Sequence, residues 1–117
     1  MFTTTATFTV GVEEELFEEI GEELPQLFEL GQNYPNPFNP TTTFEFRMGA
    51  TANVSIRVFN VLGQVVRTLV DGTMSIGVHR VTWDARDDSG TTVATGLYLY
   101  QMETSGFQSV KTLVLMK

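Results

Sequence analysis

The chain has 117 residues, of which 42% are hydrophobic, including nine Phe, three Tyr and one Trp. This length and composition suffice for one domain with a packed core, together with a tail. There is no cysteine, which excludes a disulfide framework and thiolate chemistry. No stretch approaches the roughly 20 apolar residues of a membrane helix, so we expect no membrane-spanning segment.

Charge divides the chain near residue 30. The net charge is −7, and the run EEELFEEIGEEL at 13–24 holds seven of the 14 acidic residues. No Lys or Arg precedes residue 30, whereas residues 30–117 are almost neutral. A near-neutral domain gives no sign of nucleic-acid binding.

The first residues read as two short segments. Residues 2–12, FTTTATFTVGV, alternate apolar residues with threonine, which predicts a strand. Residues 13–24 change to helical spacing, but their glutamates four residues apart repel one another and Gly21 weakens a helix. Both a solvated linker and a partner-binding helix therefore remain open. Residues 1–10 lack the basic and apolar regions of a signal peptide, so the protein either stays where it is made or is the C-terminal piece of a longer one.

Three of the four prolines lie in LGQNYPNPFNPTTTFEF, at 30–46. Proline fixes φ and pushes the preceding residue into extended conformations, so this segment runs extended or turned. An ordinary stiff linker is one interpretation. From residue 42 onward Phe44, Phe46 and Met48 alternate with polar residues, which predicts a half-buried strand.

The remaining chain reads as short strands. The pattern predicts strands at 53–60, at 65–70 with a turn at Asp71–Gly72, at 78–84, at 92–94 as a short edge strand, at 96–103 and at 107–117. The strand at 96–103 is apolar on both phases, as expected for one covered on both faces. Six or seven short strands and no helix after residue 30 predict an antiparallel β-sandwich with Trp83 in its core.

Candidate chemistry is sparse. His79 is the single histidine and shares a strand phase with Val81 and Trp83, which indicates a packed or rim position. We therefore expect no enzyme, no zinc site and no cofactor. The carboxylates of WDARDDSG are weak calcium candidates, since Arg86 interrupts the alternating ligand positions and a hydrogen-bonded turn explains them as well. These carboxylates are Asp84, Asp87 and Asp88.

Five motifs in combination resemble the C-terminal sorting domain (type A) of the type IX secretion system, over residues 31–117. They are QNYPNPFNPTTTFEF, VSIRVFNVLGQVVRTLV, GVHRVTWDARDDSG, VATGLYLYQME and KTLVLMK. The resemblance implies a seven-stranded immunoglobulin-like sandwich in secreted proteins of the Bacteroidetes group. It also implies that the domain directs attached cargo across the periplasm, through the outer-membrane translocon, to the medium or the cell surface. A sortase-like peptidase then removes the domain.

The same resemblance suggests domain bounds and site residues. Residues 1–30 are expected to be the end of an N-terminal cargo region with an acidic linker. The proline motif at the start of the domain comprises Asn33, Pro35, Asn36, Pro37, Asn39 and Pro40. Sorting recognition is expected at Lys111, Leu113, Val114, Leu115 and Lys117, although lysines on a last strand also serve as edge protection.

Two alternatives stay open. The immunoglobulin-like domain of the flagellar hook-capping protein shares the WDARDDSG-like turn, although a strand ending at Lys117 favours the sorting domain. A carbohydrate-binding module would need exposed aromatic residues such as Tyr98 and Tyr100. The apolar residues Leu97 and Leu99 on the opposite phase indicate instead a strand buried on both sides.

Overall fold

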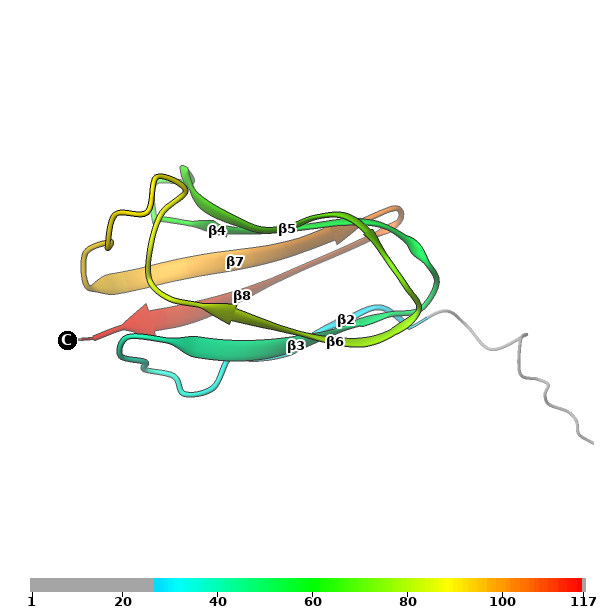
Figure 1. Ribbon diagram of the computed structural model, residues 1–117, viewed down its shortest axis with the longest axis horizontal. Coiled ribbons are helices and arrows are strands. Elements are labelled where there is room, and N and C mark those ends of the chain that lie inside the picture. Colours follow the sequence, from blue (N-terminus) through cyan, green and yellow to red (C-terminus); the bar gives the residue numbers. More distant parts are fainter. Residues whose placement is uncertain (1–26, 117) are drawn as a thin grey trace, which may run out of the picture.

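The computed structural model describes residues 27–116, which form two facing β-sheets (Figure 1). One sheet has the strand order β2 (Glu29–Leu30), β3 (Thr42–Met48), β6 (Gly77–Trp83). The other has the order β5 (Val65–Met74), β4 (Ala52–Phe59), β7 (Gly96–Thr104), β8 (Phe107–Leu115). Every strand pair is antiparallel, which confirms the predicted fold class. The segments at 2–12 and 13–24 and residue Lys117 lie outside the described residues.

The core lies between the sheets because the strands alternate as their sequences predict. In β3 the buried residues are Thr42, Phe44, Phe46 and Met48. Strands β4 and β7 bury alternate residues in the same way, and β8 does so at its end, with Leu113 and Leu115. Trp83 is 1% exposed, and its indole N–H donates to the Arg86 carbonyl at 2.9 Å. Its predicted core position is confirmed.

The predicted turn at Asp71–Gly72 is wrong. Strand β5 continues to Met74, and Asp71 and Gly72 pair with Ser55 and Val54 of β4. The pairing with β4 outweighs the local turn preference here, because ending β5 at residue 70 would leave the backbone groups of the first half of β4 without their partners on β5. The chain turns instead between Met74 and Gly77.

Two further strand predictions need correction. Residues 92–94 form no strand, since only one isolated bridge joins Thr92 to Arg86. Strand β7 is covered on one face only: Leu97 is 47% exposed on the outer face, where it pairs with Val114. An antiparallel sheet tolerates one solvated face, so its apolar outer residues do not imply a covering layer.

The short strand β2 was not predicted. Glu29 and Leu30 pair with Arg47 and Phe46, and Leu30 is 5% exposed in the core. Just before β2, the Phe28 ring lies 5.8 Å from the Phe107 ring. Residues 28–30 thus pack with the sandwich, although the expected domain begins at 31.

Candidate functional site

Strand β8 carries four of the five residues predicted for recognition, and it divides them between its two faces. Leu113 and Leu115 are 1% and 2% exposed in the core. Val114 lies on the opposite, outer phase and is half-buried. The leucines hold the two sheets together, so a partner of the folded domain reaches Lys111 and Val114 but not Leu113 or Leu115.

Lys111 lies on the inward phase of an edge strand. It pairs with Tyr100 of β7, and its side chain is half-buried. A lysine in this position buries its methylene stem and directs its ammonium group to the open edge. Each of the five arginines forms an ion pair with a carboxylate, at 2.9–3.8 Å. Within residues 27–116, Lys111 is the one Lys or Arg without an ion pair.

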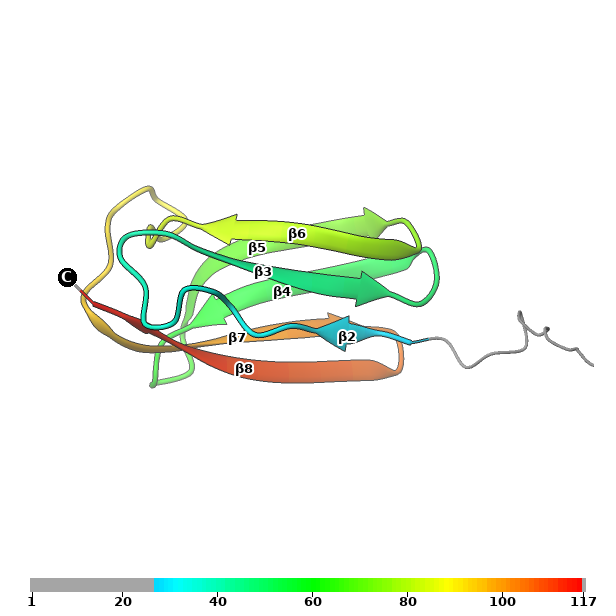
Figure 2. The ribbon, with the colours of Figure 1, turned by 90° about the horizontal axis from the view of Figure 1, so that it is seen from below.

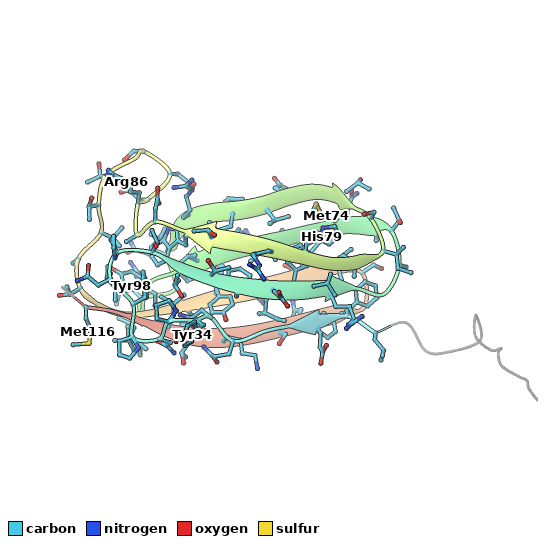
Figure 3. All side chains as sticks on the ribbon, turned by 60° about the horizontal axis from the view of Figure 1, so that its bottom comes forward. Tyr34, Met74, His79, Arg86, Tyr98 and Met116 are labelled. Carbon is cyan, nitrogen blue, oxygen red and sulfur yellow. The ribbon has the colours of Figure 1, made fainter. Side chains whose placement is uncertain are left out.

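The proline motif is held by two buried anchors. Asn33 is 3% exposed, and its amide donates to the Thr42 hydroxyl at 3.0 Å and to the Pro35 carbonyl at 3.2 Å. Phe38 is 1% exposed, with its ring centroid 5.7 Å from that of Trp83. The other residues of the motif are exposed: Pro35, Asn36, Pro37, Asn39 and Pro40. The motif is therefore a folded part of the sandwich, and its exposed Tyr34 lies on the surface (Figure 3).

The proline motif, together with Gln32 just before it and Phe38 within it, covers part of the free edge of β8 (Figure 2). The Phe38 N–H donates to the Val114 carbonyl at 2.9 Å, and the Met116 N–H donates to the Phe38 carbonyl at 3.0 Å. The Val114 N–H donates to Asn36 Oδ1 at 3.0 Å. Gln32 Nε2 donates to the Thr112 carbonyl at 2.9 Å. These four bonds satisfy backbone groups that an edge strand otherwise exposes.

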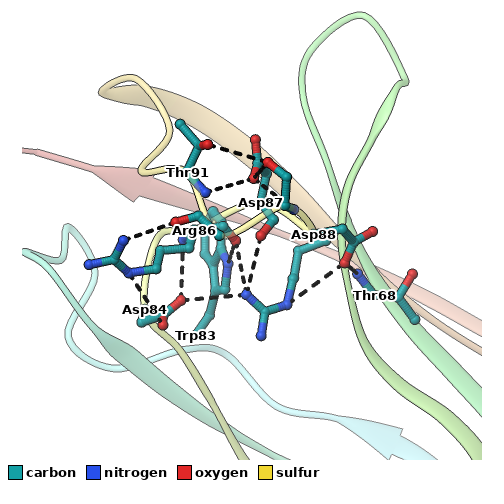
Figure 4. Close-up of polar contacts among 10 residues, drawn as sticks. Thr68, Trp83, Asp84, Arg86, Asp87, Asp88 and Thr91 are labelled. Atoms are coloured by element: carbon teal, nitrogen blue, oxygen red, sulfur yellow. Dashed lines mark hydrogen bonds and ion pairs between the residues drawn. The ribbon is translucent and has the colours of Figure 1, made fainter.

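The acidic turn covers the opposite edge of the same sheet in a similar way (Figure 4). The Asp88 N–H donates to the Val66 carbonyl of β5 at 3.0 Å. The Thr68 N–H donates to Asp88 Oδ1, also at 3.0 Å. Each sheet edge thus receives bonds from both a backbone and a side-chain group of a loop. The two motifs that stood out in the sequence share one structural role.

An arginine lies among the calcium candidates. Arg67 Nη1 is 3.7 Å from Asp84 Oδ1, and its Nε is 3.8 Å from Asp88 Oδ1. Arg67 also donates to the carbonyl of Arg86 at 3.3 Å. The guanidinium thus takes the place between two carboxylates where a cation would bind. In the described part of the chain, no three His, Cys, Asp or Glu residues group as a metal site.

Asp87 has separate partners. Its Oδ1 accepts hydrogen bonds from the Ser89 hydroxyl at 2.7 Å and from the Thr91 N–H at 2.9 Å. These bonds lower the pKa of Asp87, the Ser89 hydroxyl contributing most. The arrangement is the hydrogen-bonded turn that the sequence offered as the alternative to calcium.

The aromatic and histidine candidates are packed. Tyr98 and Tyr100 are 7% and 0% exposed, and their hydroxyls donate to the carbonyls of Ala94 and Gly31, both at 2.6 Å. Burial raises the pKa of Tyr98 and raises that of Tyr100 to about 12. Neither ring is available for stacking on a sugar. The His79 ring stacks on Phe46 with centroids 5.2 Å apart, which is the packed one of the two positions, packed or rim, expected for it (Figure 3).

Three residues of these contacts escaped the sequence analysis: Gln32, Phe38 and Arg67. Phe38 carried a usable signal, since it is the one large apolar residue inside a polar, proline-rich stretch. Gln32 and Arg67 carried no such signal in the sequence, because their hydrogen-bond partners are 80 and about 20 residues away along the chain.

A family model described as the FlgD Ig-like domain matches residues 33–106, more than half of the chain. The chain belongs to the FlgD Ig-like domain family. The basal-body rod modification proteins FlgD of Salmonella typhimurium and Salmonella typhi are each 41% identical to it over 59 residues. That alignment covers 50% of this chain and 25% of each relative, so the chain spans about a quarter of their length.

Solved structures show the same FlgD-like fold. Latent PorU of Porphyromonas gingivalis superposes with a TM-score of 0.64 and 20% identity, covering 80% of this chain and 10% of PorU. PorZ of the same organism superposes with a TM-score of 0.52 and 20% identity, and the superposition covers 74% of this chain and 11% of PorZ. FlgD of P. aeruginosa superposes with a TM-score of 0.51 and 21% identity, and the superposition covers 73% of this chain and 74% of that FlgD chain. At these identities the likeness concerns the fold alone.

The FlgD Ig-like match includes the proline motif and the acidic turn, and it ends before β8. It identifies a FlgD-related immunoglobulin-like domain, which confirms the immunoglobulin-like class expected from the sequence and its relation to the flagellar hook-capping domain. A specific assignment to the type A sorting domains stays a prediction. Among the described residues, no helix has the length and apolar character needed to cross a membrane.

Proposed function

We propose that this domain is a sorting signal for type IX secretion. It directs an attached N-terminal cargo protein through the outer-membrane translocon, and a sortase-like peptidase then removes it. The protein is thus secreted or displayed at the outer-membrane surface after passing through the periplasm. In this proposal the domain acts by binding and not by catalysis. It is in keeping with this that His79 stacks on Phe46 and that the three carboxylates of the acidic turn are engaged in hydrogen bonds or ion pairs.

The observation that carries this proposal is the composition of β8. This edge strand combines Lys111, which has no ion pair among residues 27–116, with an outer phase where Val110 is 53% exposed. An exposed strand edge with alternating apolar side chains suits recognition by addition of a partner strand. The fold likeness to PorZ gives further support, because PorZ is described as an essential bacterial surface component of the type-IX secretion system.

A reporter export assay tests the proposal. The full chain is joined to the C-terminus of a periplasmic fluorescent reporter in a bacterium with a type IX system, and in the same strain without its translocon. We expect the reporter in the medium or on the surface of the first strain and in the periplasm of the second. The immunoglobulin-like domain of P. aeruginosa FlgD, which shares the fold, serves as the matched control and should stay in the periplasm.

A second candidate is a structural module of a larger assembly, a role suggested by the relatives named basal-body rod modification proteins. The family match over residues 33–106 and the 41% identity favour it. Retention of this chain in the periplasm together with the control would contradict the sorting role and leave the structural role. Export of both would show that the translocon reads the fold in general and not β8.

A further inference from the structure

The free edge of β8 is closed along one half only. Val114 directs its N–H and carbonyl away from β7, to Asn36 and Phe38. Since alternate residues of an edge strand point the same way, Gln108 and Val110 direct their backbone groups to the same side. Within residues 27–116 the proline motif bonds to the edge from Thr112 to Met116 and not to its first half.

We propose that the segment Gln32–Phe38 is a latch on β8, and that a partner strand pairs along the whole edge of β8 only when this latch opens. The proposal rests on the sorting function, because the partner is the translocon component that reads β8. The partner that fits is an extended segment carrying a carboxylate, which would neutralise the ammonium group of Lys111. An unneutralised inward lysine on an edge strand opposes such pairing.

The latch has an outer and an inner part. Its side-chain bonds, from Gln32 to the Thr112 carbonyl and from the Val114 N–H to Asn36, are exposed to solvent, so water replaces them readily when they break. The backbone bonds of Phe38 lie next to a fully buried ring. The outer part therefore opens first, and it does so without unfolding the core.

Such an arrangement controls access to β8. A partner binds only the fraction of molecules with an open edge, so the closed latch lowers the apparent affinity by that fraction. Weakening the outer latch bonds should strengthen recognition, whereas the same change should weaken recognition if the proline motif were itself the element that is read. The sign of the effect separates the two roles.

Hydrogen exchange of the Val114 amide measures the latch directly. In Asn36→Ala this amide should exchange about fivefold faster, as expected for the loss of one net hydrogen bond, while the amide of buried Ile56 is unchanged. Asn39→Ala is the matched control, because Asn39 is also exposed and precedes a proline, but its side chain has no hydrogen bond within the described residues. Asn36→Asp keeps the acceptor oxygen and should restore protection.

The same variants are then compared by reporter export from the full chain. Asn36→Ala should be exported faster than the native chain, and Asn39→Ala at the native rate. Gln32→Ala, which removes the bond to Thr112, replaces Asn36→Ala if that variant folds poorly. Unchanged exchange at Val114, or equal or slower export of Asn36→Ala, overturns the latch. Absence of export from the native chain instead overturns the sorting function, and with it the partner assigned here, while exchange still decides whether the latch exists.

Discussion

Replacing Phe38 by alanine tests whether the proline motif is part of the folded core. Phe38 is 1% exposed, and its ring lies against the indole of Trp83. Removing a buried phenylalanine ring costs about 3–5 kcal/mol, because the transfer energy is lost and a cavity remains. Since small domains are stable by only about 5–15 kcal/mol, this one change removes a large share of the stability.

Urea unfolding provides the measurement. Trp83 is the one tryptophan of the chain and lies beside Phe38, so its fluorescence reports on the site, while circular dichroism at 215–220 nm, roughly the β-sheet band, follows the strands as a second probe. The midpoint should fall and the slope m should be unchanged. Phe38→Leu is the control, and as a smaller change of volume it should cost less than about 1.5 kcal/mol.

A loss below about 1 kcal/mol in Phe38→Ala would contradict a core position for Phe38. It would mean that residues 32–40 separate from the sandwich in solution. The bonds of Phe38 and Asn36 to β8 would then not persist either.

Three further outcomes follow from the site. Burial raises the pKa of Tyr100 from 10.0 to about 12. The neutral hydroxyl therefore contributes to the free energy of unfolding fully below pH 10, and this contribution is lost as the pH rises toward 12. The melting temperature of Tyr100→Phe should lack this alkaline decline. The hydrogen bonds from Ser89 and Thr91 lower the pKa of Asp87 from 3.8. Their contribution to the free energy of unfolding is therefore complete above that pH and is lost as the pH falls below it. Melting temperatures of Asp87→Ala should accordingly fall less steeply than those of the native chain as the pH drops below 3.8. Calorimetry with calcium at micromolar concentrations should give no isotherm, because Arg67 lies between Asp84 and Asp88, and a clear isotherm would contradict that reading.

Regular strands were predictable because their alternation carries the information locally. Phe44, Phe46 and Met48 face the core as the period of two requires, and Trp83 and His79 follow the same rule on β6. The prediction failed at Asp71–Gly72, where the pairing of β5 with residues far away in the sequence outweighs a strong local turn signal.

The functional contacts were less accessible to sequence analysis. The proline motif has no period, so nothing local distinguished its anchor Asn33 from its exposed members, and only the large apolar side chain of Phe38 indicated a core position. On β8 only the fold shows that the phase of Lys111 and Leu113 points inward. Which edge groups a loop covers depends on contacts 78–80 residues apart, which one sequence does not reveal.

The most direct test of recognition through β8 is the export of a reporter fused to the chain with both Lys111 and Lys117 replaced. Lys111→Met with Lys117→Met removes the two charges and keeps the length of the side chains, and Lys111→Arg with Lys117→Arg keeps the charge as the matched control. Methionine retains the buried stem of Lys111, so stability should change by no more than about 0.5 kcal/mol. If a type IX translocon reads β8, export of the methionine variant falls while its melting temperature holds, and the arginine variant is exported. Unchanged export of the methionine variant would contradict recognition through this strand.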